Sequence, residues 1–229
     1  MKNFLSLSLL MLSFLSTFAQ KSSVISALTK YHIDTNILNA QSKPKLANYS
    51  YDLKYTSIGD NKETVTLANF DPSKPEAERW TVISIQGKSP SKSDIATFRK
   101  NHIKPSAAAA LPDESTYQVE KETPESLVIS YKPDPKSIPA EAAFMKDCRL
   151  HLTVNLKTKR LEKIESLNEK PLKIKIFNAQ KMDLVVTLGY NETEKQYYTV
   201  SEDLNLIIKF LGQLVPMETL SEYSNYKKI

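Results

Sequence analysis

The chain has 229 residues, a formal net charge of +5, a single cysteine and four glycines. One cysteine excludes a disulfide within the chain, and the four glycines lie too far apart to form a phosphate-binding loop. The lysines are spread among acidic residues, so the positive charge favours a mixed solvent-exposed surface over a nucleic-acid interface. A chain of this length can bury a sizeable core without a disulfide or a metal.

Residues 1–19 have the layout of a secretory signal peptide. Lys2 precedes an apolar run at residues 4–18, and the small residue Ala19 precedes a polar stretch that begins at Gln20. The apolar run is shorter than the roughly 20 residues that a membrane-spanning helix needs, and no later stretch is long and apolar enough. We therefore expect cleavage after Ala19, which would leave residues 20–229 as a single domain, periplasmic or secreted, with no transmembrane anchor.

A helix is expected next, at residues 22–40, where apolar side chains such as Val24 and Leu28 recur at helical spacing. After this helix, apolar residues recur at every second position. From Tyr49 to Tyr55 aromatic and apolar residues alternate with polar ones, which is typical of a half-buried strand. Two further strands and a helix that Ser91 or Ser93 can cap are expected at residues 64–70, 80–86 and 91–102.

The rest of the chain is dominated by short segments of alternating polarity, with a short helix at residues 140–145. Strands are expected at residues 117–121, 127–131, 150–154, 160–167, 172–176, 182–188, 196–200, 204–210 and 218–226. Because short turns join most of them, neighbouring strands should be antiparallel. The pattern predicts an α+β fold, in which a curved antiparallel sheet of about ten or eleven strands carries two or three helices on its concave side.

The C-terminal half resembles the periplasmic half-barrel proteins of the lipoprotein-carrier type. The resemblance lies in the alternation at residues 150–154, the turn at 157–159, the strands as far as Leu188 and the closing segment 218–226. Residues 70–73 and 78–80 also resemble an uncharacterised exported bacterial family. The carrier resemblance implies a curved sheet whose concave face is apolar, is plugged by helices and binds acyl chains. It identifies no individual lipid-binding residue.

Side chains suited to catalysis or metal binding form no recognisable arrangement. Cys148 and His151 lie three residues apart in an expected strand, on opposite faces, so they cannot form a thiolate–imidazole pair within it. The three histidines fall in separate elements, without the spacing of metal ligands. Paired glutamates lie among lysines and arginines, which favours solvent-exposed ion pairs over acid–base catalysis. We therefore expect no catalytic residue, no metal site and no cofactor.

One face of the first strands is the candidate for a ligand-binding wall, formed by Tyr51, Leu53, Tyr55, Trp80 and Val82. Ordinary sheet core accounts for the same alternation and is the more common explanation, and both interpretations remain open. We expect a non-enzymatic exported protein that binds a lipid or another hydrophobic ligand in the hollow of the sheet. The alternative is a cell-envelope module that binds a protein partner and has an interior filled by its own side chains.

Overall fold

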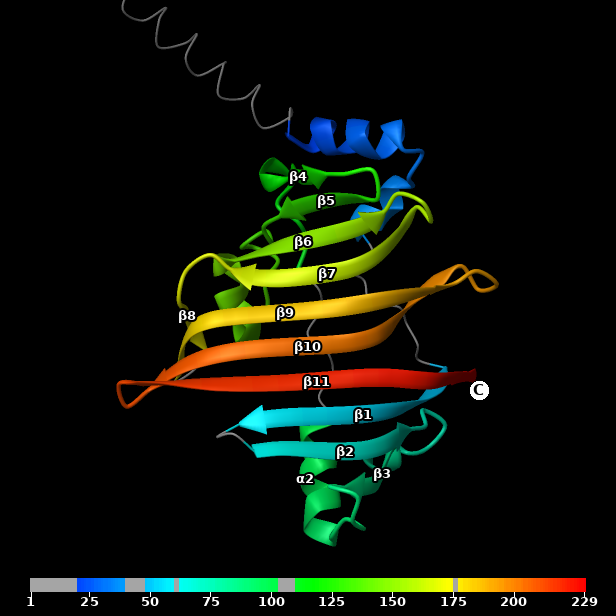
Figure 1. Ribbon diagram of the computed structural model, residues 1–229, viewed down its shortest axis with the longest axis vertical. Helices are drawn as coiled ribbons and strands as arrows, with labels where there is room; N and C mark the ends of the chain where they lie inside the picture. The colour runs from blue at the N-terminus through cyan, green and yellow to red at the C-terminus, as the bar shows by residue number, and fades with distance from the viewer. Residues whose placement is uncertain (1–19, 40–47, 60–61, 103–109, 175–176) are drawn as a thin grey trace, which may run out of the picture.

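The computed structural model describes residues 20–39, 48–59, 62–102, 110–174 and 177–229 (Figure 1). The expected signal peptide at residues 1–19 lies outside the described residues. The described residues form an eleven-stranded antiparallel sheet in the order β3-β2-β1-β11-β10-β9-β7-β6-β5-β4, and β8 pairs with β9 beside this path. The expected curved, mostly antiparallel open sheet is therefore confirmed.

Most strands pair with the strand that precedes or follows them in the chain. The main exception is β11, which lies between β10 and β1 and so connects the first three strands to the others. The strands are β1 (Tyr49–Gly59), β2 (Lys62–Phe70), β3 (Trp80–Ile85), β4 (Gln118–Glu122), β5 (Ser126–Tyr131), β6 (Cys148–Asn155), β7 (Arg160–Asn168), β8 (Leu172–Ile174), β9 (Phe177–Asn191), β10 (Gln196–Phe210) and β11 (Gln213–Lys228).

The three longest strands, β9, β10 and β11, form the middle of the sheet, with 15, 15 and 16 residues. The separate strands expected at residues 196–200 and 204–210 are parts of one continuous strand, β10, so this part of the sequence prediction was wrong. No turn divides them, because residues 201–203 stay paired with both neighbouring strands. The register against β9 shifts twice, between Thr199 and Ser201 and between Ile207 and Ile208, but the strand is not interrupted.

The first helix covers residues 20–30 and is shorter than the expected 22–40. His32 ends it by adopting a left-handed conformation, with φ of 53°. The amide of His32 donates to the carbonyl of Thr29 (3.0 Å), and the amide of Ile33 donates to the carbonyl of Leu28 (2.9 Å). These two bonds form a Schellman cap, which satisfies the last carbonyls of the helix and turns the chain away.

The other helical segments match the expected positions. The helix α2 (Lys92–His102) begins with a reciprocal cap, in which the Asp94 amide donates to Ser91 Oγ (3.2 Å) and the Ser91 amide donates to the Asp94 carboxylate (3.0 Å). The short helix expected at 140–145 is the 3-10 segment η4 (Ala140–Asp147). Three shorter 3-10 segments are η1 (Thr35–Asn39), η2 (Glu76–Glu78) and η3 (Glu114–Thr116).

Both α-helices pack on the same face of the sheet, which we call the inner face. Residues that oppose each other across a sheet point to the same side, so a ladder of paired residues identifies this face. One ladder crosses the sheet through Leu152, Ile164, Val186, Glu202, Ser221 and Tyr55. At one end Leu152 packs with residues of the helix at 20–30, and at the other Tyr55 packs with the cluster that contains Phe98 of α2.

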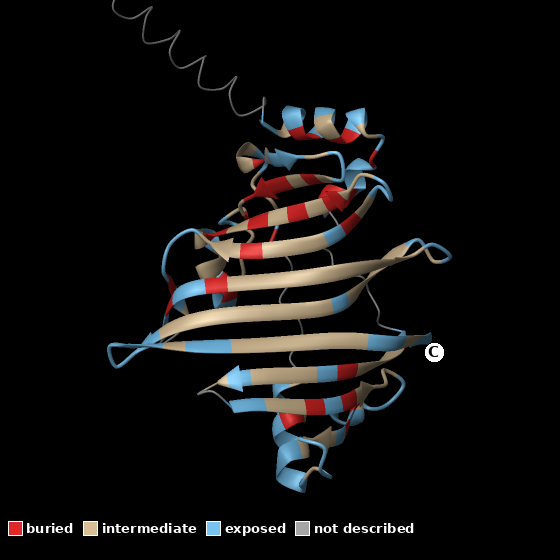
Figure 2. Ribbon diagram, viewed as in Figure 1, coloured by how far each residue is buried: buried red, intermediate tan, exposed pale blue. Residues whose placement is uncertain are grey.

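The buried core is divided among three clusters on the inner face. The first joins the helix at 20–30 to β5–β7, the second joins α2 to β1–β3, and the third lies around Cys148, Leu172, Ala179 and Met182. Between these clusters most residues of β9, β10 and β11 are half-exposed (Figure 2). The middle of the sheet is therefore less covered than its ends.

Candidate functional site

At one end of the central strands, β10 and β11 separate and the sheet divides into two arms. Their pairing stops at Ser201 opposite Glu222, although β10 begins at Gln196 and β11 continues to Lys228. On one arm β10 stays paired with β9, and on the other β11 stays paired with β1. We call this division the fork.

Irregular backbone accompanies the fork in both strands. In β10 the register shifts between Thr199 and Ser201, and in β11 Asn225 has a positive φ of 55°. The Asn225 side-chain amide donates to the Asp52 carboxylate on β1 (2.7 Å). This bond, together with one from Asn69, holds the pKa of the Asp52 carboxyl below its usual value. Such bulges bend a strand, which accounts for the separation of the two arms.

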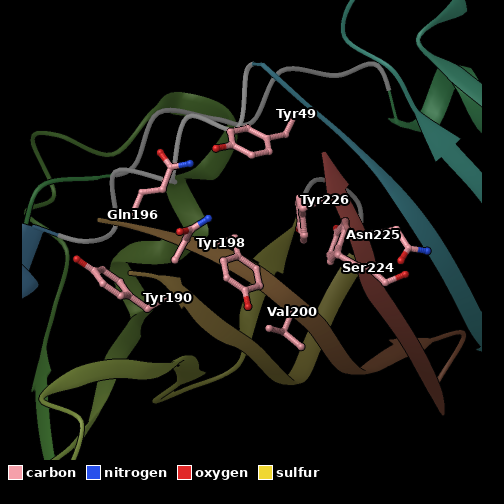
Figure 3. A pocket seen from close by; sticks show the side chains of 10 residues that line it. Tyr49, Tyr190, Gln196, Tyr198, Val200, Ser224, Asn225 and Tyr226 are labelled. Carbon is pink, nitrogen blue, oxygen red and sulfur yellow. The ribbon is translucent and has the colours of Figure 1, made fainter. Parts of the chain in front are cut away.

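A pocket of about 500 Å³ lies at the fork (Figure 3). It is lined by Tyr49, Tyr190, Asn191, Gln196, Tyr198, Val200, Tyr223, Ser224, Asn225 and Tyr226. Tyr190, Gln196 and Tyr198 come from the β9–β10 arm, and Tyr226 comes from the β1–β11 arm. None of these described lining residues carries a charge. Phenol and amide groups both donate and accept hydrogen bonds, so the pocket combines aromatic surface with neutral polar groups.

Tyr226 holds the two arms together beside the pocket. Its hydroxyl donates to the carbonyl of Thr199 on the other arm (2.6 Å). Its ring centroid lies 5.3 Å from that of Tyr198, also on the other arm. The spacing of the arms is therefore set by a side chain that itself lines the pocket.

Glu194, in the turn between β9 and β10, makes a second connection between the arms. Its carboxylate accepts a hydrogen bond from the Tyr49 hydroxyl and forms an ion pair with Lys228 Nζ (2.9 Å). The Tyr49 hydrogen bond, followed by the Lys228 ammonium, holds the pKa of the Glu194 carboxyl below its usual value. The Lys228 side chain is 61% exposed, so salt should weaken this ion pair more than it weakens the Tyr226 hydrogen bond.

The tyrosines of the pocket continue into the inner face. The ring centroid of Tyr51 lies 5.3 Å from that of Tyr226 and 5.6 Å from that of Tyr223. Burial raises the pKa of all three phenols, and the nearby carboxylate of Glu202 raises them further. The Tyr223 hydroxyl donates to Glu202 Oε2 (3.2 Å). These phenols are therefore neutral hydrogen-bond donors over the whole physiological pH range.

The five residues predicted as a ligand-binding wall, Tyr51, Leu53, Tyr55, Trp80 and Val82, do share the inner face. Leu53, Trp80 and Val82 are buried in the cluster that includes Phe98 of α2. Tyr51 and Tyr55 are half-buried, and Tyr51 contacts two tyrosines of the fork pocket. A role of these residues in ligand binding stays a prediction.

Sequence reasoning did not identify the fork pocket, because its residues come from four strands. The available signal was the density of tyrosines near the ends of β9, β10 and β11, at Tyr190, Tyr197, Tyr198, Tyr223 and Tyr226. Alternation alone placed these residues in strands. It did not show that two of the strands would separate.

A second candidate surface is a group of half-exposed aliphatic side chains on the inner face of β9 and β10. We call this group the aliphatic row; it consists of Leu184, Val186, Leu188, Leu204, Leu206 and Ile208. Leu184 lies opposite Leu204 in the sheet, which makes the row continuous across the two strands. Leu184 and Val186 belong to none of the three core clusters.

Cys148 and His151 lie on opposite faces of β6, as the alternation predicted. Cys148 is buried in the third cluster, whereas His151 lies opposite Glu165 on the outer face. Burial raises the pKa of the Cys148 thiol to about 11, so the thiol is un-ionised at neutral pH. Within the described ranges, no group of three or more histidine, cysteine, aspartate and glutamate side chains could hold a metal ion.

Searches for related proteins do not place the chain in a known group. No family model matches it, and no curated protein or solved structure is significantly similar to it. In the part of the chain that the structure describes, no helix is both long enough and apolar enough to cross a membrane.

Proposed function

We propose that this chain is an exported, non-enzymatic protein that binds a hydrophobic ligand or an acyl chain on the concave, inner face of its sheet. The observation that carries this proposal is the aliphatic row. All six side chains are half-exposed. Leu184 and Val186 lie outside the three core clusters, whereas Leu188 packs against the first cluster and the three residues of β10 pack against the third.

The energy for binding would come from covering apolar surface. Each Å² of apolar surface removed from water contributes about 25 cal/mol, so an acyl chain needs no specific polar contact to bind along such a row. The helix at residues 20–30 and α2 would limit how far a ligand extends across the sheet. A long, narrow and flexible ligand fits this space better than a rigid, bulky one.

The fork pocket would hold the polar end of the ligand. Its neutral phenols and amides can bind hydroxyl or amide groups, and its lining offers no cation for a carboxylate or phosphate. The preferred ligand is therefore an amphipathic molecule with an uncharged polar end. Tyr51, which contacts the pocket tyrosines and belongs to the second cluster, would lie between the two regions.

Two adjacent valines on β9 provide a matched test. Val186 lies on the inner face opposite Glu202, and Val185 lies on the outer face opposite Asp203; both are half-exposed. Fluorescence titration with the neutral apolar probe N-phenylnaphthylamine should show saturable binding. Val186→Asn should weaken it about tenfold, because one aliphatic contact is replaced by a polar group, and Val185→Asn should leave it unchanged. Equal effects of the two substitutions would contradict binding on the inner face.

The alternative function is a cell-envelope module that binds a protein partner. The feature that favours it is the packing of Leu53, Trp80 and Val82 under α2, where side chains fill the interior. If the protein takes up no probe, this alternative replaces the ligand-binding proposal.

Export is a separate part of the proposal and rests on the composition of residues 1–19. Mass spectrometry of the protein from a cell-envelope or secreted fraction should find a chain that starts at Gln20. A chain that keeps Met1 and remains in the cytoplasm would contradict export without bearing on ligand binding.

A further inference from the structure

Exposed apolar side chains gather at the end of the long strands that is opposite the fork. They are Ile58, Phe177, Phe210, Leu211, Leu214 and Met217. They come from the end of β1, the start of β9 and the β10–β11 hairpin, which lie at the same end of the strands (Figure 1, left). Soluble proteins rarely expose a contiguous apolar patch unless it contacts another molecule.

Among these apolar side chains, those at the tip of the β10–β11 hairpin are the most exposed. Leu211 is 89% exposed, Leu214 is 62% exposed and Phe210 is 53% exposed. Leu211 and Gly212 have positive φ values of 47° and 83° and connect the paired residues Phe210 and Gln213. These values match a two-residue type I′ turn, whose first position normally holds asparagine, aspartate or glycine. A leucine at this position is both conformationally unfavourable and solvent-exposed, so neither local structure nor packing explains it.

We propose that the β10–β11 hairpin docks on a lipid membrane by inserting Phe210, Leu211 and Leu214 at the boundary between the headgroups and the acyl chains. The apolar side chains point in different directions, which favours a lipid surface over a protein. Phe210 lies on the inner face, Leu214 lies on the outer face opposite Lys209, and Leu211 lies at the tip. A single protein surface would cover one of these directions, whereas lipids can surround all three.

The charge of the hairpin also fits a membrane surface. From Leu206 to Met217 the only charged residue is Lys209, which is exposed. A lysine near the tip can extend its ammonium group to lipid phosphates while its alkyl chain stays with the apolar side chains. The pairing of Phe210 with Gln213 satisfies backbone groups next to the turn, which lowers the cost of bringing the tip into the headgroup region.

This docking does not require ligand binding on the inner face. The hairpin tip and the fork pocket lie at opposite ends of β10, and the tip residues line neither that pocket nor the aliphatic row. The two proposals can therefore be tested and rejected separately.

The test is flotation of the full chain with vesicles of phosphatidylcholine, with and without phosphatidylglycerol. Leu211→Asn is the informative substitution, because it removes the apolar tip and creates the Asn-Gly sequence that a type I′ turn favours. It should preserve or increase the stability of the protein and still weaken partitioning into vesicles about tenfold. A loss of binding could then not be attributed to misfolding.

Two further variants complete the experiment. Ile83→Asn removes a side chain that is 55% exposed on β3, away from the hairpin, and should leave partitioning unchanged. Lys209→Gln should weaken partitioning about fivefold on vesicles that contain phosphatidylglycerol and much less on phosphatidylcholine alone. The proposal is overturned if the unaltered protein does not float with either kind of vesicle, or if Leu211→Asn binds as well as the unaltered protein.

Discussion

The ring of Tyr198 covers the backbone of Gly189, the residue opposite it in the β9–β10 pair. A Cβ atom on Gly189 would lie 2.3 Å from Cζ of that ring, which is closer than two such atoms can approach. The same ring packs against Tyr226 on the other arm of the fork. The absence of a side chain at Gly189 therefore determines where one wall of the fork pocket lies.

Gly189→Ala should destabilise the protein and displace Tyr198. The added methyl group forces the half-exposed Tyr198 ring to move away from Tyr226, and losing that aromatic contact should cost about 1 kcal/mol of unfolding free energy. Urea unfolding measures the change, and Gly59→Ala is the control because, among the described residues that are not its chain neighbours, no atom lies within 4 Å of its Cβ position. If both substitutions change stability equally, the ring is not held against Gly189.

Tyr226→Phe should lower the unfolding free energy by about 1 kcal/mol, because it removes the hydrogen bond to the Thr199 carbonyl. Tyr190→Phe is the matched control. The Tyr190 hydroxyl has no hydrogen-bond partner among the described residues, and its ring would keep the Arg160 guanidinium, 3.8 Å from the ring centroid. Thermal unfolding of the two variants should differ; identical melting would show that Tyr226 does not hold the arms together.

Leu53→Ala should act mainly on stability. Leu53 is buried beneath α2, so its truncation should cost about 2–5 kcal/mol through lost packing and a residual cavity. Binding of N-phenylnaphthylamine to the folded variant should change less than it does in Val186→Asn. An equally large loss of affinity would show instead that Leu53 belongs to the ligand wall, as the sequence predicted.

The Cys148 thiol should make stability decrease at alkaline pH. Burial raises its pKa from 9.0 to about 11, so between these pH values the thiol ionises in the unfolded chain but not in the folded one. The stability that the un-ionised thiol contributes to the folded protein is complete below pH 9 and is lost as the pH rises to 11. The unfolding free energy should fall by about 2 kcal/mol more in the unaltered protein than in Cys148→Ala over this range. Parallel curves for the two proteins would contradict the burial of the thiol.

Local sequence patterns predicted most of the elements. The alternation from Tyr49 to Tyr55 identified β1, and the two candidate capping residues Ser91 and Ser93 identified the start of α2, because both features depend on residues close together in the chain. The structure shows that Ser91 is the cap. The end of the first helix was missed, since a histidine is not the usual residue for the left-handed position of a Schellman cap. The length of β10 was missed because Glu202 interrupts the apolar pattern, although its carboxylate accepts a hydrogen bond from Tyr223.

The fork pocket could not be predicted in this way, because it depends on relationships between distant residues. The separation of β10 from β11 involves a register shift near Thr199 and the conformation of Asn225, and Asp52 on β1 holds Asn225 in place. Period-two alternation shows which residues share a face of one strand. It contains no information about where two paired strands separate.

The position of β11 also affects how the protein folds. β11 follows the other ten strands in the chain, yet it lies between β1 and β10 and is the strand that connects the β1–β3 unit to the rest of the sheet. The complete sheet can therefore form only after the last of its strands has been synthesised, and it requires pairing between residues as far apart as Tyr49 and Lys228. Closure of such long-range contacts is entropically costly and slow, so the sheet should remain incompletely folded, and accessible to chaperones, until β11 has been synthesised.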